Sequence, residues 1–483
     1  MSKPSLDYLF KPNSIALAGV SPDISKPNLA QLFTKSLRCF GFKGEIYPLH
    51  PSGGEIFGMK VYKNVKDIEG EVDYVVSAIP ARFTPQLIRD CVEKRVKAVH
   101  LFTSGYSEIE DEIGKHLEAE ILSIARKGGI RMIGPNCMGL YCPSSGMTFA
   151  AEYPDQKAFP KKPGSLGLIS QSGGNTIYTI RQCAERGVFF SKAISYGNAA
   201  DLNETDYLDY MADDPDTKLI AMYIEGLKDG RRFRQAMTKA LASKPVIVNK
   251  TGNTETGART CTSHTSSIAG SADIWSNFLK QSGAIQVGDM DELADVSLAF
   301  TMMPGPAGRN VAVVGSGGGA GVQAADDITN AGLYLPMLPA KVRKKLHDIY
   351  GTEAGSIFRN PVDSPPLRGV DNLANAVQAI AASEQVDIIL MHFGLDNWAM
   401  ISRSIPLQNF VETVSKLSTV IKKPLAIVLH YAVDPAARVL ADQAQERIVA
   451  LGLPVYPSIG RAARAIARYI DYFDRRKSRL QGK

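Results

Sequence analysis

A buried strand that runs into a glycine-rich turn and then a helix occurs twice in this chain, and this repeat limits the possible folds most. The first copy spans Ser165–Gly174 and the second spans Asn310–Gly321. The later strands correspond in order: Lys218–Ile224 with Val386–His392, and Lys244–Val248 with Lys423–Leu429. Two similar units of alternating strands and helices predict a duplicated, flavodoxin-like parallel sheet.

Strands and helices also alternate in the first part of the chain. A helical pattern spans Pro85–Arg95 and lies between buried strands. The expected strands are Ser14–Gly19, Gly44–Leu49, Val72–Ile79, Ala98–Phe102 and Arg131–Gly134. This alternation predicts a further α/β unit, with a parallel sheet covered by helices on both faces.

Chain length and two Pro-containing segments indicate how many domains to expect. A chain of 483 residues is too long for one compact core. A Pro- and Lys-rich stretch at Tyr153–Gly164 and a Pro/Gly break at Met303–Pro306 mark two boundaries. We therefore expect three domains, at residues 1–150, 151–304 and 305–483.

Charge and cysteine patterns disfavour several classes of protein. A net charge of +6 is small for this length, and aromatic residues do not alternate with basic runs, so nucleic-acid binding is disfavoured. The 6 cysteines form no zinc-ligand spacing, and we expect no metal site in this chain. Neither a leader-like start nor an apolar run of about 20 residues is present, so we expect a cytoplasmic protein without membrane contact.

The two glycine-rich turns are candidate phosphate sites. Glycines let the backbone approach a ligand closely, and the free N–H groups of a helix start favour an anion. The candidate residues are Gln171, Ser172, Gly173 and Gly174 in the first turn and Gly317, Gly318 and Gly319 in the second. Such glycines can also serve only to make a tight turn, but two copies favour phosphate binding.

His264 is the candidate nucleophile. It lies in the stretch Gly257–Ser267, which is rich in Ser and Thr and lacks bulky side chains, so we expect a mobile polar loop. With an ordinary pKa of about 6.5, a neutral imidazole is available to accept a phosphoryl group. The alternative is a surface histidine without a catalytic role.

Glu225 is the candidate supporting carboxylate. It ends a strand, and sites form at the carboxyl edge of a parallel sheet. A carboxylate there can accept a hydrogen bond from one imidazole nitrogen, orient the ring and stabilise its charged form. The alternative is a helix-capping or salt-bridge role for Glu225 near Arg231 and Arg232.

A nicotinamide cofactor is disfavoured. The first strand leads into Gly19–Pro22 rather than G-x-G-x-x-G, and the second ends at His50-Pro51 without an acidic residue for a ribose. No G-x-x-x-x-G-K-S/T motif occurs, so the sequence shows no P-loop. The first unit suits a nucleotide-bearing ligand other than NAD.

Together these segments resemble the α subunit of NDP-forming acyl-CoA synthetases, such as the ADP-forming acetyl-CoA synthetases, and more distantly succinyl-CoA synthetase. The resemblance covers essentially the whole chain. Its motifs, in order, are Gly19–Pro22, Ala78–Ala81, Thr103–Tyr106, Gly134–Cys137, Ile169–Gly173, Ser195–Asn198, Ala212–Thr217, Tyr223–Gly226, Asp229–Phe233, Ser263–Thr265 and Asn360–Asp363. The implied fold is an α/β Rossmann-like CoA-binding domain followed by two flavodoxin-like parallel-sheet domains.

The resemblance also implies roles for single residues. His264 would be the phosphohistidine, Glu225 its supporting carboxylate, and both glycine-rich helix starts would point at the phosphate. Coenzyme A (CoA) would contact Gly19, Ser21, Pro51, Ile79, Pro80, Ser104, Gly105 and Asn136, with Asn136 near the thioester. The family usually has Asn-Pro-Lys where this chain has His50-Pro51-Ser52, so a lysine contact to the CoA nucleotide is missing.

The implied reaction converts acyl-CoA, ADP and phosphate reversibly into acid, CoA and ATP, through an acyl phosphate and a phosphohistidine. An ATP-grasp β subunit would bind ADP or ATP with Mg²⁺, and the assembly would be α2β2 or a homodimer of α. The acyl group stays open between acetate, a branched or aryl acid and a dicarboxylate. The alternative function is a non-catalytic CoA-binding regulatory or scaffold protein of the same fold.

Overall fold

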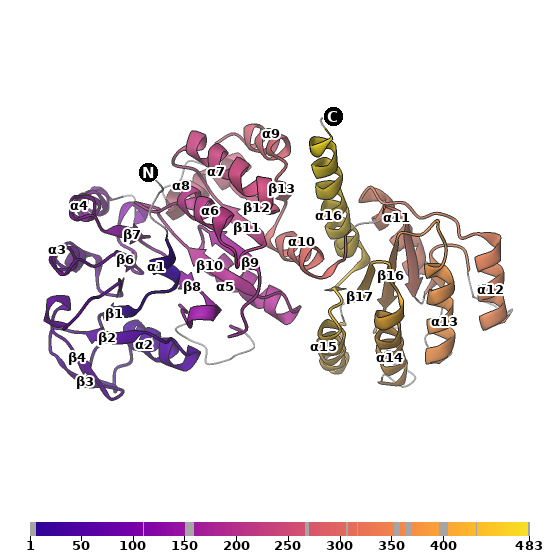
Figure 1. Ribbon diagram of the computed structural model, residues 1–483, viewed down its shortest axis with the longest axis horizontal. Coiled ribbons are helices and arrows are strands. Elements are labelled where there is room, and N and C mark those ends of the chain that lie inside the picture. The colour runs from indigo at the N-terminus through magenta and orange to yellow at the C-terminus, as the bar shows by residue number, and fades with distance from the viewer. Residues whose placement is uncertain are drawn as a thin grey trace. The chain divides into compact units, whose positions relative to one another are not determined.

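Three large sheets organise the chain in the computed structural model (Figure 1). The structure describes residues 6–109, 111–149, 159–265, 270–305, 308–315, 317–351, 358–363, 369–395, 404–430 and 432–481. Contacts divide the chain into two compact units. The first unit spans residues 1–184 and 189–290 and holds two of the sheets, and the second spans residues 185–188 and 291–483 and holds the third.

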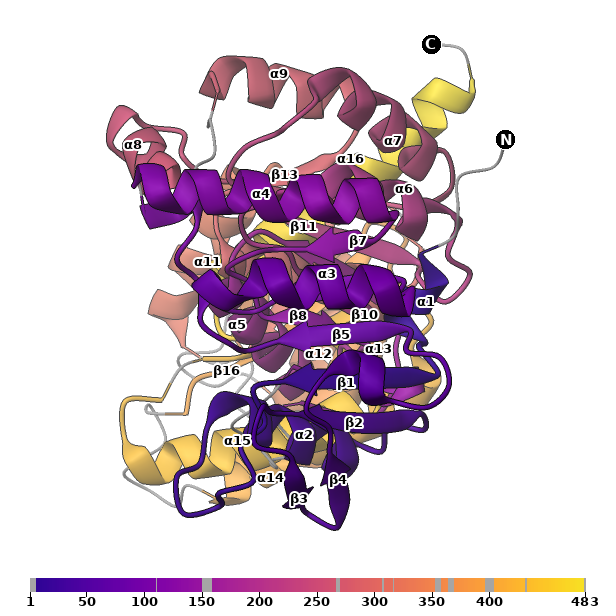
Figure 2. The same ribbon diagram turned by 90° about the vertical axis from the view of Figure 1, so that its left-hand side faces the viewer.

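The first sheet has the strand order β2-β1-β5-β6-β7, and all its strand pairs are parallel. Its strands are β1 (Ser14–Ala18), β2 (Glu45–Leu49), β5 (Tyr74–Ser77), β6 (Ala98–Leu101) and β7 (Arg131–Ile133). The helices of this part are α1 (Asp7–Phe10), α2 (Leu29–Phe40), α3 (Thr84–Lys94) and α4 (Glu112–Gly128), with 3-10 turns η1 (Val65–Asp67), η2 (Ala81–Phe83), η3 (Ser107–Ile109) and η4 (Pro143–Ser145). Helices α3 and α4 pack together along one face of the sheet (Figure 2), and an antiparallel hairpin of β3 (Gly54–Ile56) and β4 (Met59–Val61) follows β2.

The second sheet has the order β13-β12-β11-β9-β10-β8. Its strands are β8 (Gly139–Tyr141), β9 (Leu166–Ser170), β10 (Phe190–Ser195), β11 (Leu219–Ile224), β12 (Val246–Lys250) and β13 (Ile285–Val287). Its helices are α5 (Gly173–Glu185), α6 (Glu204–Asp213), α7 (Gly230–Ser243), α8 (Glu255–Thr265) and α9 (Ala272–Ser282). Only β8 is antiparallel to its neighbour, and it extends this sheet although it precedes the predicted boundary at residue 150.

The third sheet has the order β15-β14-β16-β17-β18 and is parallel throughout. Its strands are β14 (Val311–Gly315), β15 (Val362–Asp363), β16 (Ile388–Phe393), β17 (Leu425–Leu429) and β18 (Val455–Tyr456). The helices are α10 (Met290–Met302), α11 (Gly318–Asn330), α12 (Ala340–Tyr350), α13 (Val370–Ala381), α14 (Ser404–Val420), α15 (Pro435–Ala450) and α16 (Ile459–Leu480). Its core packs buried aliphatic residues of β14, β16 and β17 against α12–α15.

The parallel strands of all three sheets follow one order. Numbered along the chain, they run 2-1-3-4-5, which is the flavodoxin-like arrangement. This confirms the repeat that the glycine-rich turns predict, and it confirms the predicted α/β class. In each sheet the order reverses between the first and third parallel strands, where the crevice at the carboxyl edge is the usual ligand site. The three-domain division stays a prediction.

Local sequence explains where the helices begin and end. The Asn28 side chain accepts from the backbone N–H of Gln31 at the start of α2, and Gly41 ends that helix with a left-handed φ of 91°. The side chains of Asn203 and Asp229 cap α6 and α7 in the same way. Between residues 272 and 302 the chain forms two helices, because Gly283 ends α9 with a left-handed φ of 82° and the three-residue strand β13 follows before α10.

Candidate active site

The turn between β9 and α5 forms the first candidate phosphate site. Helix α5 begins at Gly173, and the Ser172 hydroxyl accepts from the Asn175 N–H at 3.3 Å. A Cβ at position 173 would lie 2.5 Å from Cγ of Met138, so only glycine fits against that side chain. The helix start therefore presents its first N–H groups at the carboxyl edge of the second sheet, where they favour an anion.

A cavity of about 560 Å³ opens at this helix start. It joins the glycine-rich turn of the second sheet to loops that follow strands of the first sheet. The lining residues are Leu29, Pro80, Ala81, Phe102, Thr103, Ser104, Asn136, Cys137, Met138, Gln171, Ser172, Gly173 and Gly174. Three of the predicted CoA residues and all four predicted residues of the first phosphate turn thus share one cavity.

Two loops are hydrogen-bonded together to hold Asn136 in this cavity. Asn136 has a left-handed φ of 56°, and its N–H donates to the carbonyl of Thr103 at 3.1 Å. The N–H of Asn198 donates to the carbonyl of Pro135 at 3.0 Å. The Asn198 side chain also donates to Glu108 at 2.6 Å, which ties the loop after β10 to the first sheet's loops.

Gly197 allows this close approach, and we expect its replacement by alanine to open the site. A Cβ there would lie 2.2 Å from the carbonyl oxygen of Asn136, and Gly197 has a left-handed φ of 56°. Gly197→Ala should lower the free energy of unfolding by about 2–4 kcal/mol. Gly41→Ala is the control, since Gly41 also has positive φ but meets nothing within 4 Å. Equal losses in thermal melts of both variants would contradict this.

Glu225 lies directly behind the glycine-rich turn. It follows β11, is only 1% exposed, and its backbone N–H donates to Oε1 of Gln171 at 2.9 Å. Nearby, the Asp229 side chain caps α7, and Arg232 pairs with Asp206 at 2.7 Å. The structure therefore places the predicted carboxylate next to the predicted phosphate turn.

Several titratable side chains near Glu225 interact with its charge. Lys250 is 2% exposed, and burial lowers its pKa while Cys261 and Glu225 raise it. Burial raises the pKa of the Cys261 thiol, and the Glu225 charge raises it further. Burial also raises the pKa of Tyr223 to about 12. A carboxylate, an ammonium and a thiol thus lie close together at the ends of β11 and β12 and on α8.

The predicted loop around His264 is wrong for most of its length. Helix α8 spans Glu255–Thr265 and places position 264 in its last turn, while the His264 side chain and residues 266–269 lie outside the described residues. The Thr254 hydroxyl accepts from the Gly257 N–H at 3.0 Å and starts the helix. Ser, Thr and Gly residues suggested a loop because they are weak helix formers, but this cap and packing of α8 against η3 override that preference.

A second cavity, of about 570 Å³, lies at the carboxyl edge of the first sheet between β1 and β5. Pro80 lines both cavities, so they adjoin. The residues of the second cavity are Ala18, Gly19, Asn28, Leu49, His50, Pro51, Lys63, Asn64, Val65, Ala78, Ile79, Pro80, Phe83, Gln86, Leu87 and Asp90. It therefore contains the predicted CoA residues Gly19, Pro51 and Ile79.

Some predicted site residues lie elsewhere. Ser21 and Gly105 line neither cavity; the Ser21 hydroxyl accepts from the Asp23 N–H, and the Gly105 N–H donates to Glu108. The second glycine-rich turn, Gly317–Gly319, belongs to the second compact unit. There Gly317 precedes α11, and its N–H donates to Oδ1 of Asp363 at 2.9 Å.

Sequence reasoning missed several residues that line these cavities. Met138 packs against the first glycine-rich turn, and Lys63, Asn64 and Gln86 line the second cavity. Met138 adjoins the predicted loop Gly134–Cys137, which was a usable signal. The other three come from the β3–β4 hairpin region and α3, where no local pattern marks a ligand contact.

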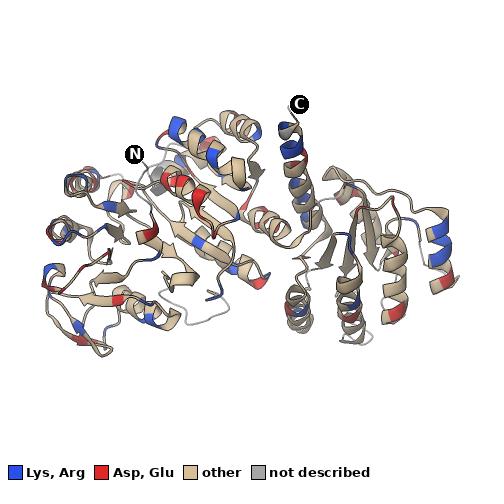
Figure 3. Cartoon of the chain, in the orientation of Figure 1, with Lys and Arg blue, Asp and Glu red and all other residues tan. Residues whose placement is uncertain are grey.

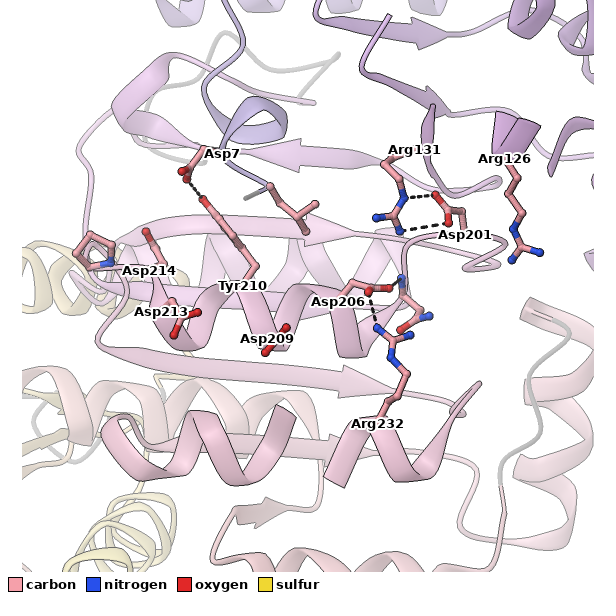
Figure 4. A pocket seen from close by; sticks show the side chains of 13 residues that line it. Asp7, Arg126, Arg131, Asp201, Asp206, Asp209, Tyr210, Asp213, Asp214 and Arg232 are labelled. Atoms are coloured by element: carbon pink, nitrogen blue, oxygen red, sulfur yellow. Dashed lines mark hydrogen bonds and ion pairs between the residues drawn. The ribbon is translucent and has the colours of Figure 1, made fainter. Parts of the chain in front are cut away.

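A third cavity, of about 670 Å³, lies among charged residues of the first unit (Figure 4). Acidic residues lie along α6, which borders it (Figure 3). Arg131 pairs with Asp201 at 2.8 Å and Arg232 with Asp206 at 2.7 Å, so two of the aspartates in the wall are neutralised by arginines of the same wall. None of the predicted site residues whose side chains the structure describes lines this cavity.

Within the described ranges, no three His, Cys, Asp or Glu residues cluster in a way that could hold a metal ion. Among the helices that the structure describes, none is both long and apolar enough to cross a membrane. The six cysteines are all free thiols.

Comparison with known proteins shows similarity along most of the chain. A family model described as a CoA binding domain matches residues 13–143, and one described as a succinyl-CoA ligase like flavodoxin domain matches residues 163–300. The chain is 36% identical over 452 residues to acetate–CoA ligase (ADP-forming) II subunit alpha of Pyrococcus furiosus, which covers 93% of this chain and 94% of that protein.

Two further matches extend the comparison. The chain is 31% identical over 479 residues to acetate–CoA ligase (ADP-forming) II of Archaeoglobus fulgidus, covering 98% of this chain but 68% of that protein. Among solved structures, the Ca. Korarchaeum cryptofilum dinucleotide forming acetyl-coenzyme A synthetase 1, in complex with phosphate and ADP, matches with a TM-score of 0.81 and 29% identity over 99% of both chains.

Proposed function

Since this chain belongs to the family of ADP-forming acyl-CoA synthetase α subunits, we propose that His264 carries the phosphoryl group between an acyl phosphate, formed from acyl-CoA and phosphate, and ADP. The cavity of about 560 Å³ is the observation that supports this most, because it places Pro80, Ser104 and Asn136 beside the helix start at Gly173. A thioester held by the first-sheet loops can meet a phosphate held by the N–H groups of α5 there.

The first step would form the acyl phosphate. A phosphate oxygen attacks the thioester carbonyl carbon, the C–S bond breaks, and CoA leaves as its thiol after taking up a proton. The N–H groups at the start of α5 hold the phosphate charge in place, and no reorganisation is needed when the transition state forms. Asn136 would contact the substrate near the reacting carbonyl, since it lines the same cavity.

The second and third steps would pass through His264. One imidazole nitrogen attacks phosphorus, and the bond from phosphorus to the acyl oxygen breaks, releasing the acid. A terminal oxygen of ADP then attacks phosphorus, the N–P bond breaks and ATP forms. Glu225 would accept a hydrogen bond from the other imidazole nitrogen. Positions 261 and 264 of α8 have the spacing that shares a helix face, and Cys261 already lies in the field of Glu225.

CoA would lie across the two adjoining cavities. Its nucleotide would occupy the cavity of about 570 Å³ at Gly19, Pro51 and Ile79, and its pantetheine arm would pass Pro80 toward Asn136. Ligands of open α/β sheets bind at this reversal of strand order, which supports the placement. Ser21 and Gly105 line neither cavity, and their contact with CoA stays a prediction.

The nucleotide and its Mg²⁺ would be bound by a separate ATP-grasp β subunit. The Archaeoglobus fulgidus relative is longer than the region it shares with this chain, whereas the Pyrococcus furiosus relative is named as a subunit. An α2β2 assembly or a homodimer of α, and a cytoplasmic location, stay predictions. Phosphate binding at Gly317–Gly319 of the second unit stays a prediction.

The test is reconstitution. The chain should be co-expressed with a candidate ATP-grasp partner, and ADP release from ATP measured with CoA and a panel of acids. We expect ADP release over many turnovers that requires both CoA and an acid, together with labelled phosphate on this chain. The partner alone is the control. Binding of ATP by the complex without acid- and CoA-dependent ADP release for any acid would contradict the proposal.

The non-catalytic alternative is not favoured. Two relatives reported above are named as ligases, and the hydrogen bond between the Glu225 N–H and Gln171 of the first glycine-rich turn supports a catalytic role. The acyl group stays open, and the acid panel above would identify it.

A further inference from the structure

Lys63 is the one Lys or Arg among the residues that line the cavity of about 570 Å³. Within the described part of the chain its ammonium makes no hydrogen bond or ion pair. The acid in the wall, Asp90, is already satisfied: it accepts from Asn64 at 2.7 Å and Gln86 at 3.0 Å, and pairs with Lys66 at 3.1 Å. The cavity therefore holds one uncompensated positive charge.

Backbone pairing places Lys63 beside the end of β2. Tyr62 forms a parallel bridge with Leu49, its N–H donates to Pro48 at 2.9 Å, and its carbonyl accepts from His50 at 2.9 Å. The Lys63 stem crosses the following turn, since a Cβ on Gly53 would lie 3.3 Å from Lys63 Cε. Lys63 thus projects from the hairpin over the turn at which β2 ends.

That turn contains no Lys or Arg. It reads His50-Pro51-Ser52, and the Ser52 N–H donates to Nδ1 of His50 at 3.3 Å. Nearby lysines are engaged: the Lys60 ammonium lies 4.6 Å from the Tyr62 ring centroid, and Lys66 pairs with Asp90 and Glu93. Lys63 is the remaining cation at this corner of the cavity.

In nucleotide-binding sheets of this class, residues near the end of the second strand contact the ribose, and a cation there accommodates a phosphate on that ribose. CoA carries such a group as its 3′-phosphate. We propose that Lys63 binds the 3′-phosphate of CoA, supplying from the hairpin the charge that the turn after β2 lacks. This inference rests on the proposed function, because it takes CoA as the occupant of the cavity.

Affinities for CoA and for dephospho-CoA, which lacks the 3′-phosphate, test the proposal on the full chain by calorimetry. Lys63→Ala should weaken CoA binding roughly ten-fold and leave dephospho-CoA binding unchanged. Lys63→Arg should keep most of the affinity. Lys60→Ala is the matched control, because it removes a lysine from the same hairpin that does not line the cavity.

The outcomes separate the two claims. If Lys63→Ala binds CoA as the wild type does, or loses the same factor for both ligands, the assignment to the 3′-phosphate is overturned while CoA binding stands. If the wild-type chain binds neither ligand, alone or with its partner, the proposed function fails with it. A loss confined to CoA supports the proposal.

Discussion

Replacing His264 with alanine is expected to abolish phosphorylation of this chain. The side chain is the only nucleophile in the proposed route between acyl phosphate and ADP, so overall turnover should fall by at least about 10⁴-fold. The measurement is incorporation of labelled phosphate from ATP in the complex with the ATP-grasp partner. CoA binding should be unchanged, since none of the described residues that line the two cavities lies on α8.

His116→Ala is the control for this variant. His116 lies on α4, is exposed, and lines neither cavity. It should retain full phosphorylation and turnover. Wild-type labelling of the His264→Ala chain would contradict the role of His264, and loss of CoA binding in that variant would show that the change disturbs the fold instead.

Glu225→Gln should give the second largest loss. The amide keeps the shape of the side chain, and the bond from the residue's backbone N–H to Gln171 does not depend on the carboxylate. The charge that stabilises a protonated or phosphorylated imidazole is lost, so turnover should fall by about 10²- to 10⁴-fold. Rapid-quench measurement of phosphoenzyme formation should show the same loss, while the affinity for CoA stays constant.

Glu255→Gln is a matched control, because Glu255 is an exposed acid at the start of α8. It should change turnover by less than about two-fold, because a single exposed charge contributes little energy. If Glu225→Gln forms phosphoenzyme as fast as Glu255→Gln does, Glu225 does not support the histidine.

The fold could be predicted from the sequence where strands are long and apolar. Residues such as those of β9, β11 and β14 are buried throughout, and glycine turns follow two of these strands. The short strand β13 was missed, because three residues between helices show no periodicity. The antiparallel strand β8 was missed for the same reason, and its pairing with β10 is set by tertiary contacts.

The candidate site could be predicted in part. The strand–turn–helix pattern of the sequence predicts the glycine-rich turns and the end of β11. The structure then brings Glu225 and Gln171 into contact. The helical state of α8 could not be read from its Ser- and Thr-rich residues, since its cap and packing decide it. Lys63 was missed because its place beside β2 depends on the bridge between Tyr62 and Leu49.

The position of the phosphoryl group in the wild-type chain tests the central claim most directly. Trypsin should release the peptide Thr260–Lys280, whose only histidine is His264. After brief reaction of the complex with labelled ATP and an alkaline quench, we expect the label on this peptide, stable to base, labile to acid and discharged by ADP. Label on another peptide, or an acid-stable label on a Ser or Thr of this one, would contradict the account.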